Sequence, residues 1–335
     1  MSVSHPRAAG RARPTVSQAL ARDRLGVPAV LYFILAGVAP LTVAAGVIPT
    51  AYAATGLTGI PAAFLVVGVV LAVFAAGYVA MARHVTNSGA FYAFISRGLG
   101  RPAGVAAALT ALVAYSFLQV GLYGALGPAA ASEAAAHLGV HLQWWQWALI
   151  AWALIALLGL ARVDITGWVL GVLLTAEITV VAAEAIAGLA HPAGGHLSFA
   201  TLSPAGLGSA GWQTCGVLAV IAVLGFVGFE QAPVLAEEAR RPRRTIPAAT
   251  YTALAVIAVV YAGAAWSMAS HAGTSHVTAT AAAQGPGLMF GLAGSAGLSQ
   301  AAQLLFMTSL FAAALAFHNC VWRYMFALGR ENVLP

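Results

Sequence analysis

Three carboxylates lie inside long apolar runs of this 335-residue chain: Glu177, Glu184 and Glu230. An ionisable side chain buried among apolar residues at membrane depth is costly, so each one is a candidate functional group. Glu177 and Glu184 are seven residues apart and therefore share one face of a helix. For Glu177 the alternative is a structural hydrogen bond to a neighbouring helix. Glu184 lies nearer the end of its run, and the alternative for this residue is that its carboxylate contacts interfacial water.

Glu230 follows the stretch Gly225-Phe226-Val227-Gly228-Phe229, and Pro233 comes three residues later. Glycine weakens a helix and proline removes one of its backbone hydrogen bonds, so this stretch predicts a helix break with Glu230 beside it. Unpaired backbone amides at the break can hydrogen-bond the carboxyl group. Glu230 is therefore either a proton carrier or a structural tie.

A second stretch of the same kind lies in the first apolar run. It contains Gly37, Pro40, Thr42, Gly46 and Pro49, which predict a break at about residues 40–44. Paired helices interrupted by glycine or proline, in corresponding positions of two halves, indicate the binding site of a secondary transporter. An ordinary kink at each position is the alternative, because both residues are common in membrane helices.

Other polar residues support fewer kinds of chemistry. Tyr115, Gln119 and Tyr123 are spaced by four and share one helix face, which either lines a cavity or hydrogen-bonds a neighbouring helix. Three histidine pairs have metal-like spacing, but no cysteine or acid cluster accompanies them. We therefore expect solvated loop histidines and no metal site at His137/His141, His191/His196 and His271/His276.

The sequence contains no Walker loop, no dinucleotide-binding glycine motif, no Gly-x-Ser-x-Gly and no His-Glu-x-x-His. These absences give no support for ATP hydrolysis or intramembrane proteolysis. We expect a protein that is not an enzyme and has no cofactor.

Composition defines the elements that must position these residues. The chain is 61% hydrophobic and 7% charged, whereas soluble domains carry about 25% charged residues. About 20 apolar residues cross a bilayer as a helix. We predict an all-α membrane protein with eight spans at residues 29–54, 60–82, 103–131, 144–160, 167–190, 211–236, 248–270 and 304–328.

All fifteen basic residues are arginines, and in this arrangement every one falls on the same side of the membrane. By the positive-inside rule that side is cytoplasmic, which places residues 1–28 in the cytoplasm as an N-terminal tail. The net charge of +6 is thus explained by topology and does not indicate nucleic-acid binding.

Three motifs resemble those of the amino acid–polyamine–organocation superfamily of permeases. The first follows the second span and is similar to the family's Pro-Gly-Gly-x-Tyr-x-Tyr: Asn87-Ser88-Gly89-Ala90-Phe91-Tyr92-Ala93-Phe94. The second resembles Phe-x-Gly-Phe-Glu with its following acidic and basic run: 226–230, 235–238 and 241–247. The third resembles the exit of the eighth span: Asn319, Arg323 and 326–335.

The resemblance implies two inverted five-helix repeats with unwound spans 1 and 6, usually within twelve spans. Residues 29–190 would form the first repeat, and 211–335 the first three spans of the second. We therefore expect the chain to lack the last two helices of that repeat. In the family, amides of span 1 bind the substrate carboxylate and carbonyls of span 6 bind its ammonium. Carried over by position, the substrate-binding residues are Thr42, Val43 and Ala44, with Phe226, Val227 and Gly228, where Phe226 is either a gate over the substrate or faces lipid.

We add Gln119 to the substrate-binding residues because it lies on the polar stripe, and we expect Glu230 and Glu177 to couple transport to protons. Sodium is the alternative coupling ion, because Thr308 and Ser309 in the eighth span are candidate sodium ligands. The function that we expect is secondary active import of an amino acid or related amine across the cell membrane, with membrane lipid around the protein. The alternative is a membrane sensor that binds an amine without transporting it.

Overall fold

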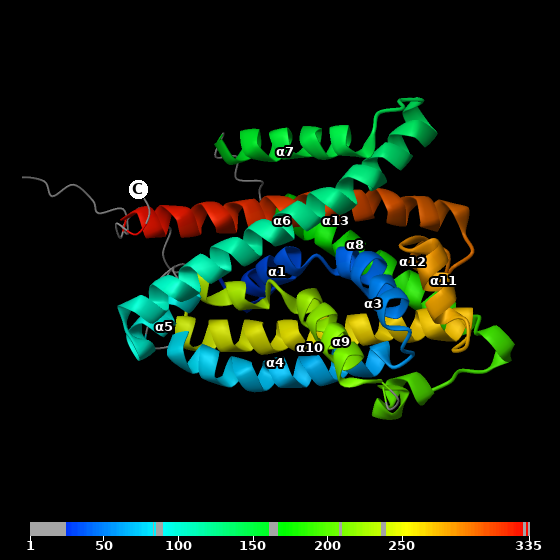
Figure 1. The fold of residues 1–335 in the computed structure, drawn as a ribbon, viewed down its shortest axis with the longest axis horizontal. Coiled ribbons are helices and arrows are strands. Elements are labelled where there is room, and N and C mark those ends of the chain that lie inside the picture. The colour runs from blue at the N-terminus through cyan, green and yellow to red at the C-terminus, as the bar shows by residue number, and fades with distance from the viewer. Residues whose placement is uncertain are drawn as a thin grey trace, which may run out of the picture.

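The computed structural model describes residues 25–82, 84, 90–160, 167–207, 210–235, 239–330 and 333. These residues form a bundle of long helices (Figure 1), and their β-pairing is limited to one bridge between Leu25 and Ala239. The all-α membrane class is confirmed. Several predicted features lie outside the described residues: the N-terminal tail before residue 25, Asn87 to Gly89 of the first motif, Arg83, Arg162, Glu237, Glu238 and most of 331–335.

The helices fall into two parts along the chain, separated by three short 3₁₀ turns. The first part contains α1 (Val27–Val38), α2 (Pro40–Thr42), the π-helix η2 (Val43–Val47), α3 (Ile48–Thr55), α4 (Ile60–Ala82), α5 (Ala90–Leu99), α6 (Arg101–Leu138), α7 (Trp144–Leu160) and α8 (Gly167–Ala190). Three short 3₁₀ turns follow: η3 (Ala193–Gly195), η4 (Ala200–Leu202) and η5 (Pro204–Leu207). The second part contains α9 (Trp212–Phe226), η6 (Phe229–Leu235), α10 (Pro242–Ala272), α11 (Val277–Gln284), α12 (Gly287–Phe290) and α13 (Ala296–Arg330).

Seven stretches among the described residues are long and apolar enough to cross a membrane, and they match seven of the eight predicted spans. The fourth predicted span is the helix α7, which has 17 residues. At 1.5 Å per residue it is about 25 Å long, a little short of the hydrocarbon layer. The helix is confirmed, and its crossing of the membrane stays a prediction. α6 has 38 residues and runs obliquely across the bundle (Figure 1).

The long helices pack in pairs. α10 lies along α4, and α13 packs against α6, which crosses it obliquely (Figure 1). The second span thus pairs with the seventh, and the third with the eighth. This is the pairing that a two-fold relation between two repeats gives, although the inverted repeat itself stays a prediction.

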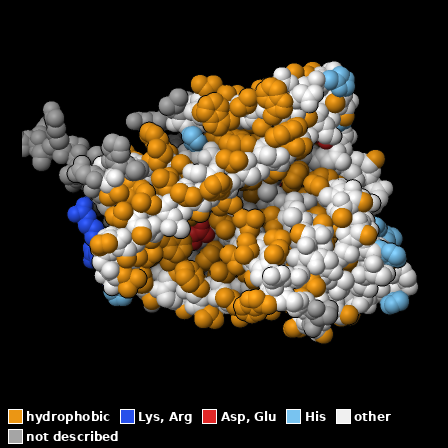
Figure 2. Space-filling model, in the orientation of Figure 1, with side chains coloured by type: hydrophobic (Ala, Val, Ile, Leu, Met, Phe, Trp, Pro, Cys, Tyr) orange, Lys and Arg blue, Asp and Glu red, His pale blue; other side chains and the backbone are white. Residues whose placement is uncertain are grey.

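Charge is separated between the two ends of the bundle. Figure 2 shows arginine side chains at the end where α5 and the start of α10 lie, several histidines at the opposite end, and a largely hydrophobic surface between them. The exposed apolar side chains include Val73, Phe117, Val120 and Val220. Such a belt is stable against lipid and not against water. Arginines segregated at one end agree with the predicted topology.

Candidate functional site

The first helix break lies at Ala39. This residue has φ 52° and ψ 73°, in the left-handed region, between the end of α1 and the start of α2. Pro40 begins the new helix, where its missing N–H costs nothing. The predicted break at residues 40–44 was thus placed one residue too late. Residues 40–47 are helical, first as α2 and then as η2, and the Val43 N–H donates to the Ala39 carbonyl over 3.2 Å.

The second break is where the sequence predicted it. α9 ends at Phe226, Val227 is extended, and Gly228 has φ +116° before η6 begins. A Cβ atom at Gly228 would lie 3.0 Å from the backbone of Gly37 and of Val38, so only glycine fits there. A Cβ at Gly37 would in turn lie 2.9 Å from the Gln231 side chain. The two breaks therefore pack directly against each other.

Glu230 holds the second break together. Its Oε2 accepts a hydrogen bond from the Gly228 N–H (2.7 Å), and its Oε1 accepts one from the Tyr115 hydroxyl (2.9 Å). The Tyr78 hydroxyl donates to the Glu230 carbonyl (2.6 Å). The side chain is buried, 6% exposed. Of the two predicted roles, this geometry directly accounts for the structural tie.

Glu177 performs the corresponding task at the first break. Its carboxylate accepts hydrogen bonds from the Ser309 hydroxyl (2.8 Å) and from the backbone of Leu41. The Thr42 hydroxyl donates to Ser309 over 3.0 Å. A continuous chain of polar groups thus runs from Thr42 through Ser309 to Glu177. It joins the first span to α13 and α8.

Glu184 does not reach interfacial water, so that interpretation was wrong. Its side chain is 0% exposed, and its Oε2 accepts a hydrogen bond from the Ala293 N–H (2.8 Å). Ala293 lies in the loop between α12 and α13. The carboxylate therefore holds this loop against α8, because a buried carboxylate needs donors and the loop amide supplies one.

A cavity of about 970 Å³ lies beside both breaks. Its walls come from the first span, α6, α9 and α13, and the segment joining α11 to α12 covers part of it. Most of the lining is apolar, with Phe117, Phe290, Phe306 and Phe317 as its aromatic members. Polar side chains are few: Thr42, Thr50, Ser132, Glu133 and Gln303.

Three of the predicted substrate-binding residues line this cavity: Thr42, Val43 and Val227. Ala44 and Gly228 do not: Ala44 is fully buried, and Gly228 faces the first break. Gln119 is not part of the lining either. Its amide nitrogen donates to the Tyr123 hydroxyl (2.9 Å) and lies 3.3 Å from His318 Nδ1 on α13.

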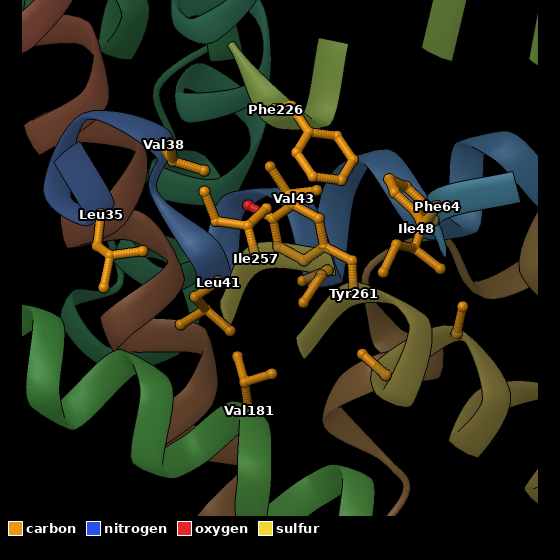
Figure 3. Packing of buried hydrophobic residues seen from close by; sticks show 14 of the residues in the cluster. Leu35, Val38, Leu41, Val43, Ile48, Phe64, Val181, Phe226, Ile257 and Tyr261 are labelled. Atoms are coloured by element: carbon orange, nitrogen blue, oxygen red, sulfur yellow. The ribbon is translucent and has the colours of Figure 1, made fainter. Parts of the chain in front are cut away.

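Phe226 is neither a gate over the cavity nor a lipid-facing residue. It is 0% exposed, and its ring centroid lies 6.2 Å from that of Phe64 and 6.0 Å from that of Tyr261. Figure 3 shows this aromatic cluster around Val43. The cluster packs the end of α9 against the first span and α10, so Phe226 fixes the position of the break.

Sequence reasoning missed four polar residues of the cavity: Thr50, Ser132, Glu133 and Gln303. Glu133 fell outside the predicted third span, which ended at residue 131, whereas α6 continues to Leu138. The sequence did contain a signal for Glu133, in the spacing of the residues along this helix. The α6 residues that line the cavity recur every three or four positions, and Glu133 continues that face: Leu118, Gly121, Leu122, Ala125, Pro128, Ala129, Ser132 and Glu133.

Comparison with known proteins adds one finding to this geometry. No curated protein matches the chain. The family model of the amino acid permeases matches residues 29–335, which includes both breaks and every wall of the cavity. The chain therefore belongs to the amino acid permease family, a family of transporters.

Proposed function

We propose that the protein is a secondary active transporter that imports an amino acid or related amine across the cell membrane, coupled to protons. The observation that carries this proposal is the cavity where the breaks of the first and sixth spans meet. Backbone polar groups at membrane depth are tolerated only where protein or a water-filled cavity receives them. A pair of interrupted helices beside a cavity is the arrangement of a transporter site.

The substrate in this proposal lies between the two breaks. Its carboxylate faces the start of the helical segment that contains Thr42, Val43 and Ala44, because a helix N-terminus attracts anions. Its ammonium group faces the carbonyl of Val227, which lines the cavity just after α9 has ended; Phe226 and Gly228 flank Val227 and do not line the cavity. Gln119 lies outside the cavity lining, so in this proposal it supports α6 against α13 and does not contact the substrate.

Of the two candidate coupling residues, we assign the proton first to Glu177. Its hydrogen-bond chain through Ser309 ends at Thr42, which lines the cavity. Protonation of Glu177 would therefore change the hydrogen bonding of a residue at the site. Glu230 is instead tied to the Gly228 amide and to Tyr115, behind the break. Sodium at Thr308 and Ser309 is the competing assignment.

The test is uptake of labelled amino acids into liposomes that contain the full protein. An inward proton gradient should drive accumulation, and a sodium gradient without a proton gradient should not. Glu177→Gln keeps a hydrogen-bonding side chain that cannot ionise. It should retain exchange of substrate across the membrane and lose gradient-driven accumulation at least tenfold.

Glu230→Gln is the matched comparison and should retain more gradient-driven accumulation than Glu177→Gln. The reverse order would transfer coupling to Glu230, and accumulation by sodium alone would refute proton coupling. Binding of amino acids without any uptake would favour the alternative function, a membrane sensor that binds an amine without transporting it.

The proposed orientation places the arginine-rich end in the cytoplasm. Ser275 is exposed in the loop after α10, at the other end of that helix from Arg243 and Arg244. A Ser275→Cys variant should react with an impermeant maleimide added outside intact cells, with the parent protein as control. Reaction only after lysis would reverse the orientation.

A further inference from the structure

Among the residues that the structure describes, Glu133 is the only acidic one that lines the cavity, and no arginine lines it. From this charge and its position we propose that Glu133 selects substrates with a second positive charge: an amino acid with a cationic side chain, or a diamine. The inference rests on the proposed transport function and names its substrate class.

The surroundings of Glu133 leave its carboxylate without adequate donors. Its side chain is 14% exposed, and its Oε2 is buried without a hydrogen-bond partner. Nε2 of His137 lies 3.4 Å from this oxygen, and the amide nitrogen of Gln300 lies 3.3 Å from the same imidazole nitrogen. A buried carboxylate in this state is stabilised by a cation that enters the cavity.

The register between α6 and α13 locates Glu133 along the cavity. Gln119 meets His318, and His137 meets Gln300, so 18 residues along α6 match 18 residues back along α13. The helices are therefore antiparallel and in constant register. Ser309 lies nine residues before His318, which puts it level with Pro128.

Ser309 also marks the level of the first break, since it accepts the hydrogen bond of Thr42. Glu133 lies five residues beyond Pro128 on the same helix. At 1.5 Å per residue this is about 7.5 Å along the axis, away from the arginine-rich end. A four-carbon side chain places its terminal charge about 6 Å from Cα, given bonds near 1.5 Å. The head group can thus lie at the breaks while the second charge reaches Glu133.

The wall between these two points suits the hydrocarbon part of such a substrate. Ala129 on α6 lines it, and Phe306 on α13 faces it at the level of residue 131. Lysine-like side chains bury their methylenes along apolar surface and keep the charged end at a polar group. Gln303 lines the same part of the cavity as Glu133, because the register places it opposite residue 134.

The experiment compares lysine with norleucine, which has a four-carbon side chain and lacks the terminal amine, in liposomes with the full protein. The wild type should transport lysine in preference. Glu133→Gln should lower the lysine-to-norleucine ratio of kcat/KM about tenfold or more, the usual size of a lost charged hydrogen bond. The double variant Glu133→Gln/Gln303→Glu moves the carboxylate to the facing helix at the same level and should restore much of the ratio.

The possible outcomes test the role of Glu133 and the proposed transport function separately. An unchanged ratio in Glu133→Gln, or a wild type that transports norleucine and not lysine, would overturn the inference and leave amino-acid transport standing. A lowered ratio that Gln303→Glu does not restore would show that contacts of Glu133 other than charge matter, and would also overturn it. A wild type that transports neither of these two substrates nor any other labelled amino acid would refute the proposed function. In that case greater thermal stabilisation by lysine than by norleucine, lost in Glu133→Gln, still supports the role of Glu133, and equal stabilisation rejects it.

Discussion

The two helix breaks differ in what holds them. At the sixth span the tie is local: Gly228 turns the chain, and Glu230, two residues later, accepts its amide hydrogen bond. At the first span the tie is distributed: Ala39 turns the chain, and the partners are Glu177 from α8 and Ser309 from α13.

This difference has a structural consequence for transport. A break held by its own sequence keeps its shape when neighbouring helices move. A break held by two other spans changes its hydrogen bonding whenever those spans shift relative to it. We therefore expect the first break to respond to the transport cycle, and the second to serve as the more rigid reference. The following predictions test that comparison.

The largest loss of stability should come from Glu230→Ala. It leaves the Gly228 N–H and the Tyr115 hydroxyl without their acceptor in a buried site. Each unsatisfied group costs about 1–3 kcal/mol, so we expect a loss of about 3 kcal/mol or more, measured as thermal unfolding in detergent. Glu230→Gln is the control, because its amide can accept from Gly228 and donate to Tyr115. An equal loss in both variants would argue against the local tie.

Gly228→Ala should be the next most harmful change. Alanine at φ +116° is strained, and its Cβ would lie 3.0 Å from the backbone of the first span. We expect a loss of about 2–3 kcal/mol in the same unfolding measurement. Gly216→Ala on α9 is the matched control, since a Cβ there meets nothing within 4 Å. A Gly228→Ala protein as stable as this control would contradict the close contact between the breaks.

Ser309→Ala should weaken the distributed tie by about 1–2 kcal/mol. It removes the donor to Glu177 and the acceptor of Thr42 together. Ser116→Ala provides the comparison, because the Ser116 hydroxyl donates only within its own helix, to the Leu112 carbonyl. Equal melting temperatures for the two variants would remove the case for a tie that spans three helices.

The smallest effect should come from Ala39→Gly. Glycine relieves the left-handed conformation, worth about 1 kcal/mol, but loses about 0.5–1 kcal/mol through its freer unfolded chain. The net change should lie within about 0.5 kcal/mol of zero. Ala36→Gly, inside α1, has no strain to relieve and should be destabilised by about 0.5–1 kcal/mol. If Ala39→Gly falls as far as Ala36→Gly, the backbone at residue 39 is not strained.

The same contrast explains what could be predicted from the sequence. The second break was readable because Gly228, Glu230 and Pro233 stand together in one short stretch. The spans were readable because length and apolar composition determine them locally. Phe226 packs on Phe64 and Tyr261 from two other helices, and such long-range contacts leave no local pattern. Glu133 was missed for a different reason, since helix ends are the least certain part of any such prediction.

The backbone bridge near the arginine-rich end has a mechanical consequence. The Arg240 N–H donates to the Leu25 carbonyl over 2.9 Å, which joins the entry of the first span to the entry of α10. The first segment runs to the break at Ala39, and the second follows the break at Gly228. Because this hydrogen bond joins the two segments, a movement of one pulls on the other. Opening this end of the protein therefore either moves both segments together or first breaks the hydrogen bond between Arg240 and Leu25.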